Sequence, residues 1–326
     1  MPKNSITSRA NTNKANSEEV TLSRRRRYDR SPTESLCVSL TPVRLDIMHF
    51  LAELRFLSLP QIARLCCPSP RQELAEKSAR RQMRLLFDAG LVDVIPVSRA
   101  ALAPAGVLND ASLLYGSAPN IYAPTVLGLE TLHRAGLIEK PDAARKKPAY
   151  GPKNSLFLAH ELAVRDVRVW LELAARESGH ELEQWRDGEA AAVDLKRDHS
   201  PFSVRPDAWF VLRLGQAVLV GLVEVDRGTE RGERRWSEKL DAYAALFASG
   251  RLPCVTGYVN ARVLVIAPDI RRRDHLAGII EKWGGQSTSR FWIADQAIFD
   301  EVNLQLSYWR QGTDLSLRPL IFSGIT

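Results

Sequence analysis

The sequence predicts an α+β protein with two domains. Apolar residues recur at helical spacing through much of residues 41–89, and two apolar runs with strand character, residues 205–214 and 218–225, lie in the second half. Between the halves, residues 139–153 are rich in Pro, Lys and Ala, which is typical of a linker. The length agrees with this division, because 326 residues allow about two domains.

The N-terminal segment is predicted to be a disordered basic tail. It contains few large apolar side chains that could support a folded core. Its main feature is a run of four basic residues, Arg24, Arg25, Arg26 and Arg27. Such a run either binds nucleic-acid phosphates or is only a solvated tail, and both interpretations stay open.

Three helices are predicted after the tail. Thr41 is a candidate cap for the first helix. Ser58 and Gln61 form a candidate capping box for a short second helix. A third helix covers about residues 76–89, and two short strands follow it. This order of elements is typical of a winged helix-turn-helix domain.

The third helix is predicted to read DNA. Its polar side carries basic residues that could reach phosphates and base edges in the major groove: Lys77, Arg80, Arg81 and Arg84. The alternative is a solvated helix face in a domain used for protein contacts. The net charge of +7 and the pI near 9.4 agree with a polyanionic partner, although a basic surface can also serve solubility alone.

Several classes of function are disfavoured by what the sequence lacks. The four cysteines form no CxxC or Cys/His cluster, so we expect reduced thiols and no structural zinc. No apolar stretch is typical of a signal peptide or a membrane span, which predicts a cytoplasmic protein without a membrane partner. The motifs of a P-loop ATPase, a two-histidine relaxase, a GxSxG hydrolase and an HExxH protease are also missing.

A split acidic pattern carries the candidate chemistry. Asp207 begins one strand-like run, and Glu224 and Asp226 lie at the end of the next. A turn around Gly215 would pair the two runs as an antiparallel hairpin, which would place Asp207 beside the other two carboxylates. Three neighbouring carboxylates repel unless a cation or a proton intervenes. The pattern therefore predicts a Mg²⁺ or Mn²⁺ site that could polarise a phosphodiester.

This pattern resembles the PD-(D/E)xK nuclease superfamily. Asp207 matches its first acid and Glu224 its second, whereas Asp226 stands where the lysine is expected. The resemblance implies a restriction-endonuclease-like fold, with Lys239 on the next helix as a stand-in for the lysine. It implies the catalytic residues Asp207, Glu224 and Lys239 and the metal ligands Asp207, Glu224 and Asp226. The alternative is a structural network in which the acids pair with Arg227, Arg205 or Lys239.

The layout from about residue 40 to 300 is also similar to the replication-relaxation family of plasmids and integrated elements. The resemblance is carried by the winged-helix segment and by four short runs: Leu158 to Leu162, Arg205 to Asp207, Glu224 to Glu230 and Lys239 to Tyr243. Within the first of these runs, His160 is either a hydrogen-bonded core histidine or a residue of the site. The run of arginines at 271–273 is expected to be a solvated helix start or a further part of a DNA path.

This resemblance implies a role in plasmid replication or DNA topology. Together, the charge, the third helix and the acidic pattern lead to the hypothesis of a DNA-binding protein of a mobile element, which acts in replication or DNA processing and has a candidate metal-dependent nuclease site. The alternative is a non-catalytic transcriptional or replication regulator whose nuclease-like domain is a dimerisation or partner platform. Double-stranded DNA is the expected partner, and the sequence also allows a homodimer and replication or transfer proteins. The predicted segments are a tail (1–38), a winged helix-turn-helix domain (39–138), a linker (139–153), a PD-(D/E)xK-like domain (154–300) and a C-terminal extension (301–326).

Overall fold

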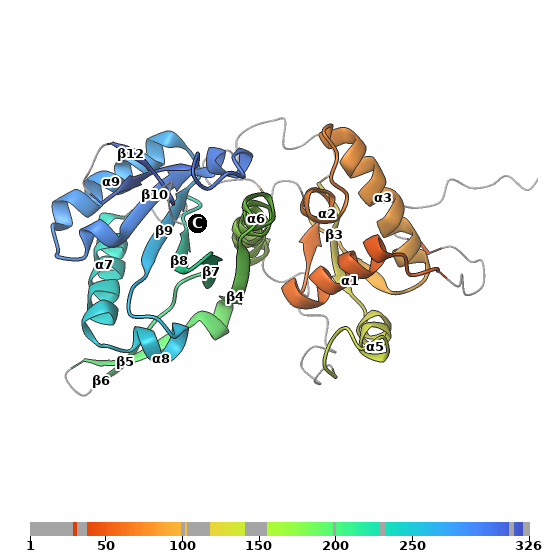
Figure 1. Ribbon diagram of the computed structural model, residues 1–326, viewed down its shortest axis with the longest axis horizontal. Helices are drawn as coiled ribbons and strands as arrows, with labels where there is room; N and C mark the ends of the chain where they lie inside the picture. Colours follow the sequence, from red (N-terminus) through yellow and green to blue (C-terminus); the bar gives the residue numbers. More distant parts are fainter. Residues whose placement is uncertain are drawn as a thin grey trace, which may run out of the picture.

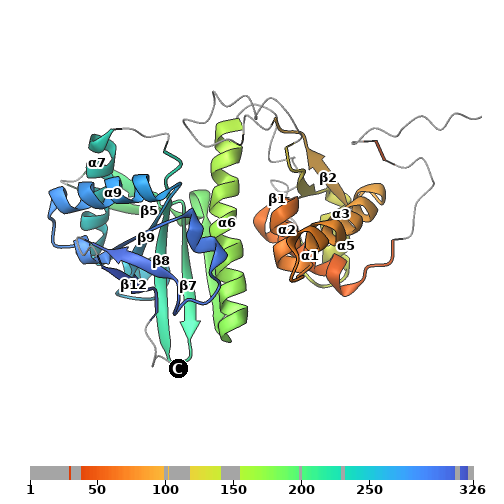
Figure 2. The same ribbon diagram turned by 90° about the horizontal axis from the view of Figure 1, so that it is seen from above.

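A computed structural model describes residues 29–30, 38–98, 102, 118–140, 155–197, 200–228, 232–312 and 316–321. The long helix α6 (Ser155–Ser178) lies between a small helical lobe and a larger lobe built on a mixed sheet (Figures 1 and 2). The combination of helices with a large mixed sheet confirms the predicted α+β class. The arginine run at 24–27 lies outside the described residues.

The helical lobe precedes α6. Its helices are α1 (Pro42–Leu54), α2 (Leu59–Cys66), α3 (Gln72–Asp88) and α5 (Val126–Arg134). Its antiparallel strands are β1 (Leu57–Ser58), β2 (Val92–Ile95) and β3 (Ile121–Pro124), in the spatial order β1-β3-β2. In this lobe α1, α2 and α3 precede the paired strands β2 and β3, and β1 lies between α1 and α2. The assignment of the lobe as a winged helix-turn-helix domain stays a prediction.

Local capping signals explain where two of these helices begin. The Ser58 hydroxyl accepts from the Gln61 N–H at 3.4 Å, and the Gln61 side chain accepts from the Ser58 N–H at 2.9 Å. This is the predicted capping box of α2. Thr125 caps α5 in the same manner, because its hydroxyl accepts from the Gly128 N–H at 3.0 Å.

Two other predicted helix starts need correction. Thr41 precedes α1, but its side chain makes no capping hydrogen bond. Pro42 occupies the first position of α1, where its fixed backbone angle favours a helix and its missing N–H costs nothing. Helix α3 begins at Gln72, earlier than the predicted start near residue 76.

The larger lobe is a seven-stranded sheet in the order β12-β11-β10-β9-β8-β7-β4. The strands are β4 (Glu181–Asp187), β7 (Ala208–Leu214), β8 (Ala217–Val225), β9 (Arg262–Ala267), β10 (Phe291–Asp295), β11 (Tyr308–Gln311) and β12 (Leu317–Pro319). A separate hairpin, β5 (Val193–Arg197) with β6 (Ser200–Val204), was missed by the prediction. The helices after α6 are α7 (Glu233–Ala248), α8 (Leu252–Thr256) and α9 (Ile270–Trp283), with 3-10 turns at η2 (Gly188–Ala191), η3 (Thr288–Arg290) and η4 (Gln296–Asp300).

Strands β7 and β8 form the predicted antiparallel hairpin. Their register joins Ala208 to Val223 and Leu214 to Ala217, and Gly215 turns the chain with a φ of 63°. Strands β8, β9 and β10 are parallel, so the helices that follow β8 and β9 begin at the edge where these strands end. Side chains alternate across β8, and as a result Leu222 packs with the α7 side and Val223 with the α6 side.

The sheet continues beyond residue 300. Strands β11 and β12 belong to the segment predicted as a C-terminal extension, yet they pair with β10 and with each other. Trp309 on β11 is fully buried, and its ring centroid lies 6.0 Å from that of Trp170 on α6. The C-terminal segment therefore contributes to the same core as α6.

Helix α6 also binds the helical lobe. The Gln61 side-chain amide donates to the Leu162 carbonyl at 3.0 Å and to the Asp166 carboxylate at 2.7 Å. Arg165 is fully buried and donates to the Leu54 carbonyl at 3.0 Å. These contacts place one face of α6 against α1 and α2, and another part of the same helix reaches the sheet edge described next.

Candidate functional site

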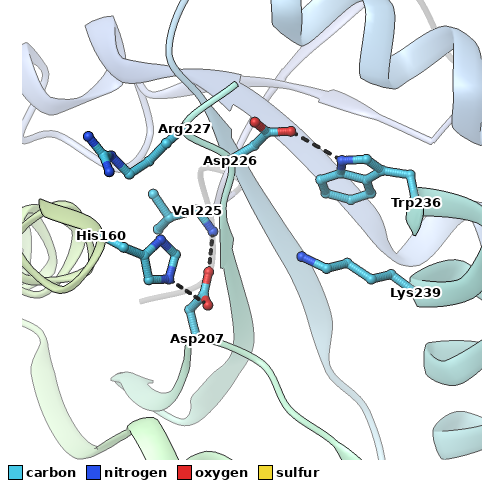
Figure 3. Close-up of a pocket in the computed structure, with 7 residues that line it drawn as sticks. All are labelled: His160, Asp207, Val225, Asp226, Arg227, Trp236 and Lys239. Carbon is cyan, nitrogen blue, oxygen red and sulfur yellow. Dashed lines mark hydrogen bonds and ion pairs between the residues drawn. The ribbon is translucent and has the colours of Figure 1, made fainter. Parts of the chain in front are cut away.

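A pocket of about 270 Å³ lies where β7 begins and β8 ends (Figure 3). It spans the end of the sheet, because His160 reaches it from α6 and Lys239 reaches it from α7 on the other face. Its lining residues are His160, Asp207, Val225, Asp226, Arg227, Trp236 and Lys239. The pocket thus gathers the segments that carried the predicted chemistry.

Asp207 is held in place from three directions. Its backbone N–H bonds the Val223 carbonyl at 2.9 Å, and one carboxylate oxygen accepts from the Val225 N–H at 2.7 Å. The other oxygen lies 2.9 Å from Nε2 of His160. Burial alone would lower the pKa of His160, but the hydrogen bond and the charge of Asp207 outweigh it and raise that pKa. The structure therefore makes His160 a site residue that the predicted catalytic set did not include.

Glu224 precedes the lining residue Val225 on β8 and is buried, with its side chain 3% exposed. One carboxylate oxygen accepts from the Tyr243 hydroxyl at 2.6 Å, and the other lies 2.8 Å from the Lys239 ammonium. Burial raises the pKa of Glu224, Lys239 opposes this, and the charge of Asp207 adds to it. Lys239 therefore reaches the acidic cluster, which the sequence alone could not show because it depends on the rotation of α7.

Asp226 shares the α7 side with Glu224 but has its own partners. One oxygen accepts two N–H bonds from Arg272, at 3.1 and 2.7 Å, and one from Nε1 of Trp236 at 3.1 Å. The other oxygen accepts from the Gly228 N–H. Arg272 was expected to belong to a solvated helix start, and that expectation is wrong, because its side chain is only 14% exposed and pairs with Asp226.

The three carboxylates do not fit one shared metal site as they lie here. Among the residues that the structure describes, no group of three or more His, Cys, Asp or Glu side chains could hold a metal ion. Arg272, Trp236 and Gly228 satisfy Asp226, so it does not fit as a third ligand. Asp207 and Glu224 still carry the oxygen donors that Mg²⁺ prefers, and Mg²⁺ commonly takes one or two carboxylates with several waters.

The face of α3 predicted to read DNA is polar and solvent-exposed. Lys77, Arg80 and Arg81 are exposed, whereas the opposite side of the helix is buried through Ala75, Ala79, Met83, Leu86 and Phe87. Arg84 differs from the other three basic residues. It is partly buried, pairs with Asp88 at 3.0 Å and donates to the Asp29 carbonyl at 2.8 Å. Three of the four predicted residues are thus presented to solvent, and Arg84 makes contacts within the protein.

Comparison with known proteins gives one family match. Residues 48–259 match the replication-relaxation family, which is more than half of the chain. Neither the curated proteins nor the solved structures gave a significant match. Among the described helices, none combines the length and the apolar character needed to cross a membrane.

Proposed function

The chain belongs to the replication-relaxation family, and we propose that it is a DNA-binding protein of a plasmid or integrated mobile element, acting in replication or DNA processing. The observation that carries the DNA-binding part is the face of α3. Three basic side chains are exposed on a helix whose other side is anchored in an apolar core. A B-DNA major groove is wide enough to admit such a helix, and basic side chains there bind phosphates and guanine edges.

The electrostatic part of this proposal has a measurable size. Each phosphate neutralised by a lysine or arginine releases counterions, so the logarithm of affinity falls with the logarithm of salt by about 0.9 per contact. If Lys77, Arg80 and Arg81 each bind a phosphate, they contribute about 2.7 to that slope. A substitution that removes them should therefore change the salt dependence and not only the affinity.

Fluorescence anisotropy on labelled duplex DNA tests this. The triple variant Lys77→Gln, Arg80→Gln and Arg81→Gln should bind duplex DNA at least about tenfold more weakly. The slope of log affinity against log salt concentration should become less steep by about 2 to 3. The matched control removes three exposed arginines of the larger lobe, Arg234, Arg235 and Arg271, by the same substitution. Equal losses in both variants would show that only the total charge matters, and the assignment to α3 would then be rejected.

A second candidate function is metal-dependent DNA cleavage at the pocket. The observation that favours it is the meeting of Asp207, Glu224 and Lys239, which come from the two strands of the hairpin and from α7. A divalent ion bound by Asp207 and Glu224 would polarise a phosphodiester. Lys239 supplies a positive charge at the pocket wall, and Asp207 is fixed by the Val225 N–H.

The same contacts also favour a non-catalytic regulator. Each carboxylate already has a nitrogen partner: His160 for Asp207, Lys239 for Glu224 and Arg272 for Asp226. Incubation of supercoiled plasmid with Mg²⁺ or Mn²⁺ distinguishes the two functions, with Asp207→Asn as the matched variant. Nicking that disappears in the variant would establish cleavage. Plasmid left intact, but still bound by both proteins, would establish the regulator.

A further inference from the structure

Arg44, in the first turn of α1, reaches across to the flank of α3. Its Nε donates to the Gln82 side-chain oxygen at 2.8 Å, and its Nη1 donates to the Ser39 carbonyl. The guanidinium is planar and turns only as a unit, so two acceptors on different segments fix its direction. The hydrogen bond to Gln82 is partly buried, which protects it in part from competition with water.

The charge of Arg44 does not stabilise α1 itself. A cation in the first turn of a helix opposes the helix dipole, and the first turn of α1 holds no acidic residue that could offset it. The two acceptors of Arg44, an amide oxygen and a carbonyl oxygen, are neutral. These contacts therefore hold the positive charge in place without neutralising it.

The position of Gln82 on α3 decides where this charge lies. Successive residues of an α-helix are turned by about 100° around its axis. Arg80 and Gln82 both adjoin Arg81 in the sequence, so their side chains project to opposite flanks of Arg81. Arg80 and Arg81 are exposed, and Arg44 adds a positive charge on the flank that Gln82 occupies.

We propose that Arg44 is a phosphate-binding residue of the DNA interface of α3, with Gln82 as the positioning residue that directs it. The inference rests on the proposed DNA binding by α3 and extends that interface to α1. The major groove is about 12 Å wide and is bounded by the two phosphate backbones. With Arg81 directed into the groove, Arg80 points toward one backbone and Arg44 lies toward the other. Phosphate contacts on both sides would fix the orientation of α3 in the groove.

The chemistry of the guanidinium suits this role. Arginine carries several N–H donors in one plane, and the bonds to Gln82 and Ser39 use two of them. A phosphate oxygen can accept from another N–H of the same group. Because the direction of Arg44 is set before DNA binds, little side-chain freedom is lost when it contacts a phosphate.

Fluorescence anisotropy of the full chain on labelled duplex DNA tests the role of Arg44. Arg44→Gln should bind several-fold more weakly on every sequence, and its slope of log affinity against log salt should be about 0.9 less steep. The advantage of the wild type over this variant should therefore shrink about threefold between about 50 and 200 mM salt. The matched control is Arg234→Gln, which removes an exposed arginine of the larger lobe and should leave the slope unchanged.

A double-mutant cycle tests the role of Gln82. Gln82→Ala removes the acceptor but keeps the charge of Arg44, so it should weaken binding several-fold in the wild-type background. It should weaken binding no further in the Arg44→Gln background. Gln82→Glu should also weaken binding, because a carboxylate at this position would pair with Arg44 and neutralise it. All binding is measured below the thermal transition of each variant, so that loss of folding does not contribute.

The other outcomes overturn the inference. An unchanged salt slope in Arg44→Gln would show that Arg44 contacts no phosphate, even if the affinity falls. Losses from Arg44→Gln and Gln82→Ala that simply add, or a change of base preference in Gln82→Ala, would show that Gln82 does not act through Arg44. A wild-type chain that fails to bind duplex DNA even at low salt would overturn the proposed function and this inference with it.

Discussion

Replacing Lys239 by methionine tests whether its ammonium group is what balances the charge of Glu224. Methionine keeps most of the side-chain volume but removes the charge 2.8 Å from the carboxylate. Among the described residues, Glu224 would then keep a hydrogen bond from the Tyr243 hydroxyl at 2.6 Å, and its side chain is 3% exposed. An unpaired carboxylate at such a depth is costly because water replaces the lost partner only in part.

The expected loss of stability depends on how deeply Glu224 and Lys239 are each buried. Removing one partner of a fully buried ion pair costs about 3–5 kcal/mol. Lys239 is 37% exposed, so water screens part of the interaction, and we expect about 1–3 kcal/mol at pH 8. Burial already raises the pKa of Glu224 and Lys239 opposes this, so the variant should raise it further. When the pKa of a carboxyl group is higher in the folded state than in the unfolded state, the fold loses stability as pH rises above the unfolded-state pKa. The loss of stability caused by Lys239→Met should therefore be smaller at pH 5 than at pH 8.

Urea unfolding of the wild type, Lys239→Met and Lys239→Met/Glu224→Gln at pH 5 and pH 8 measures this. The glutamine cannot ionise, so the double variant should recover most of the stability lost at pH 8. A Lys239→Met variant as stable as the wild type at pH 8 would refute the reasoning. So would a double variant that recovers nothing, because the cost would then come from packing.

Three further predictions concern other groups. Burial raises the pKa of Asp166 from 3.8 to about 6, so its ionisation lowers the stability of the fold as pH rises through that range. Asp166→Asn should therefore raise the free energy of unfolding by up to about 3 kcal/mol at pH 8 and by little at pH 4. Chemical denaturation at the two pH values measures this. Because the pKa of His160 is raised, its pairing with Asp207 stabilises the fold below about pH 6.5, and this stabilisation is lost as pH rises. His160→Gln should therefore lower the melting temperature more at pH 5.5 than at pH 8.5, which thermal unfolding measures. A methyl group on Gly221 would meet the Phe210 ring at 2.2 Å, so Gly221→Ala should cost about 1–3 kcal/mol, and an unchanged melting temperature would contradict that contact.

Local patterns predicted the parts of the fold that depend on neighbouring residues. The capping box at Ser58 and Gln61 lies within four residues, and its backbone geometry follows from the residue types alone. The meeting of Asp207 with the end of β8 follows from a tight turn and an antiparallel register. The predicted cap at Thr41 is absent, and α1 begins at Pro42, whose fixed φ suits the first helical position.

The candidate site was only partly predictable, because most of its contacts join distant segments. Asp226 and Arg272 are 46 residues apart, and His160 and Asp207 are 47 apart. Whether Lys239 faces Glu224 depends on the rotation of α7, which the packing of Trp236 and Leu240 against the sheet decides. Helical periodicity indicates which residues share a face, but it does not say which face a distant carboxylate will meet.

The sequence by itself determined the α+β class, the hairpin that joins Asp207 to Glu224 and the basic face of α3, because each follows from spacing along one segment. Tertiary structure alone decided that Asp226 pairs with Arg272 and that Arg30 lies on the end of α3. The physical reason is that charged side chains select partners by proximity in the folded chain. That proximity is set by how helices pack on a sheet, and not by the order of residues.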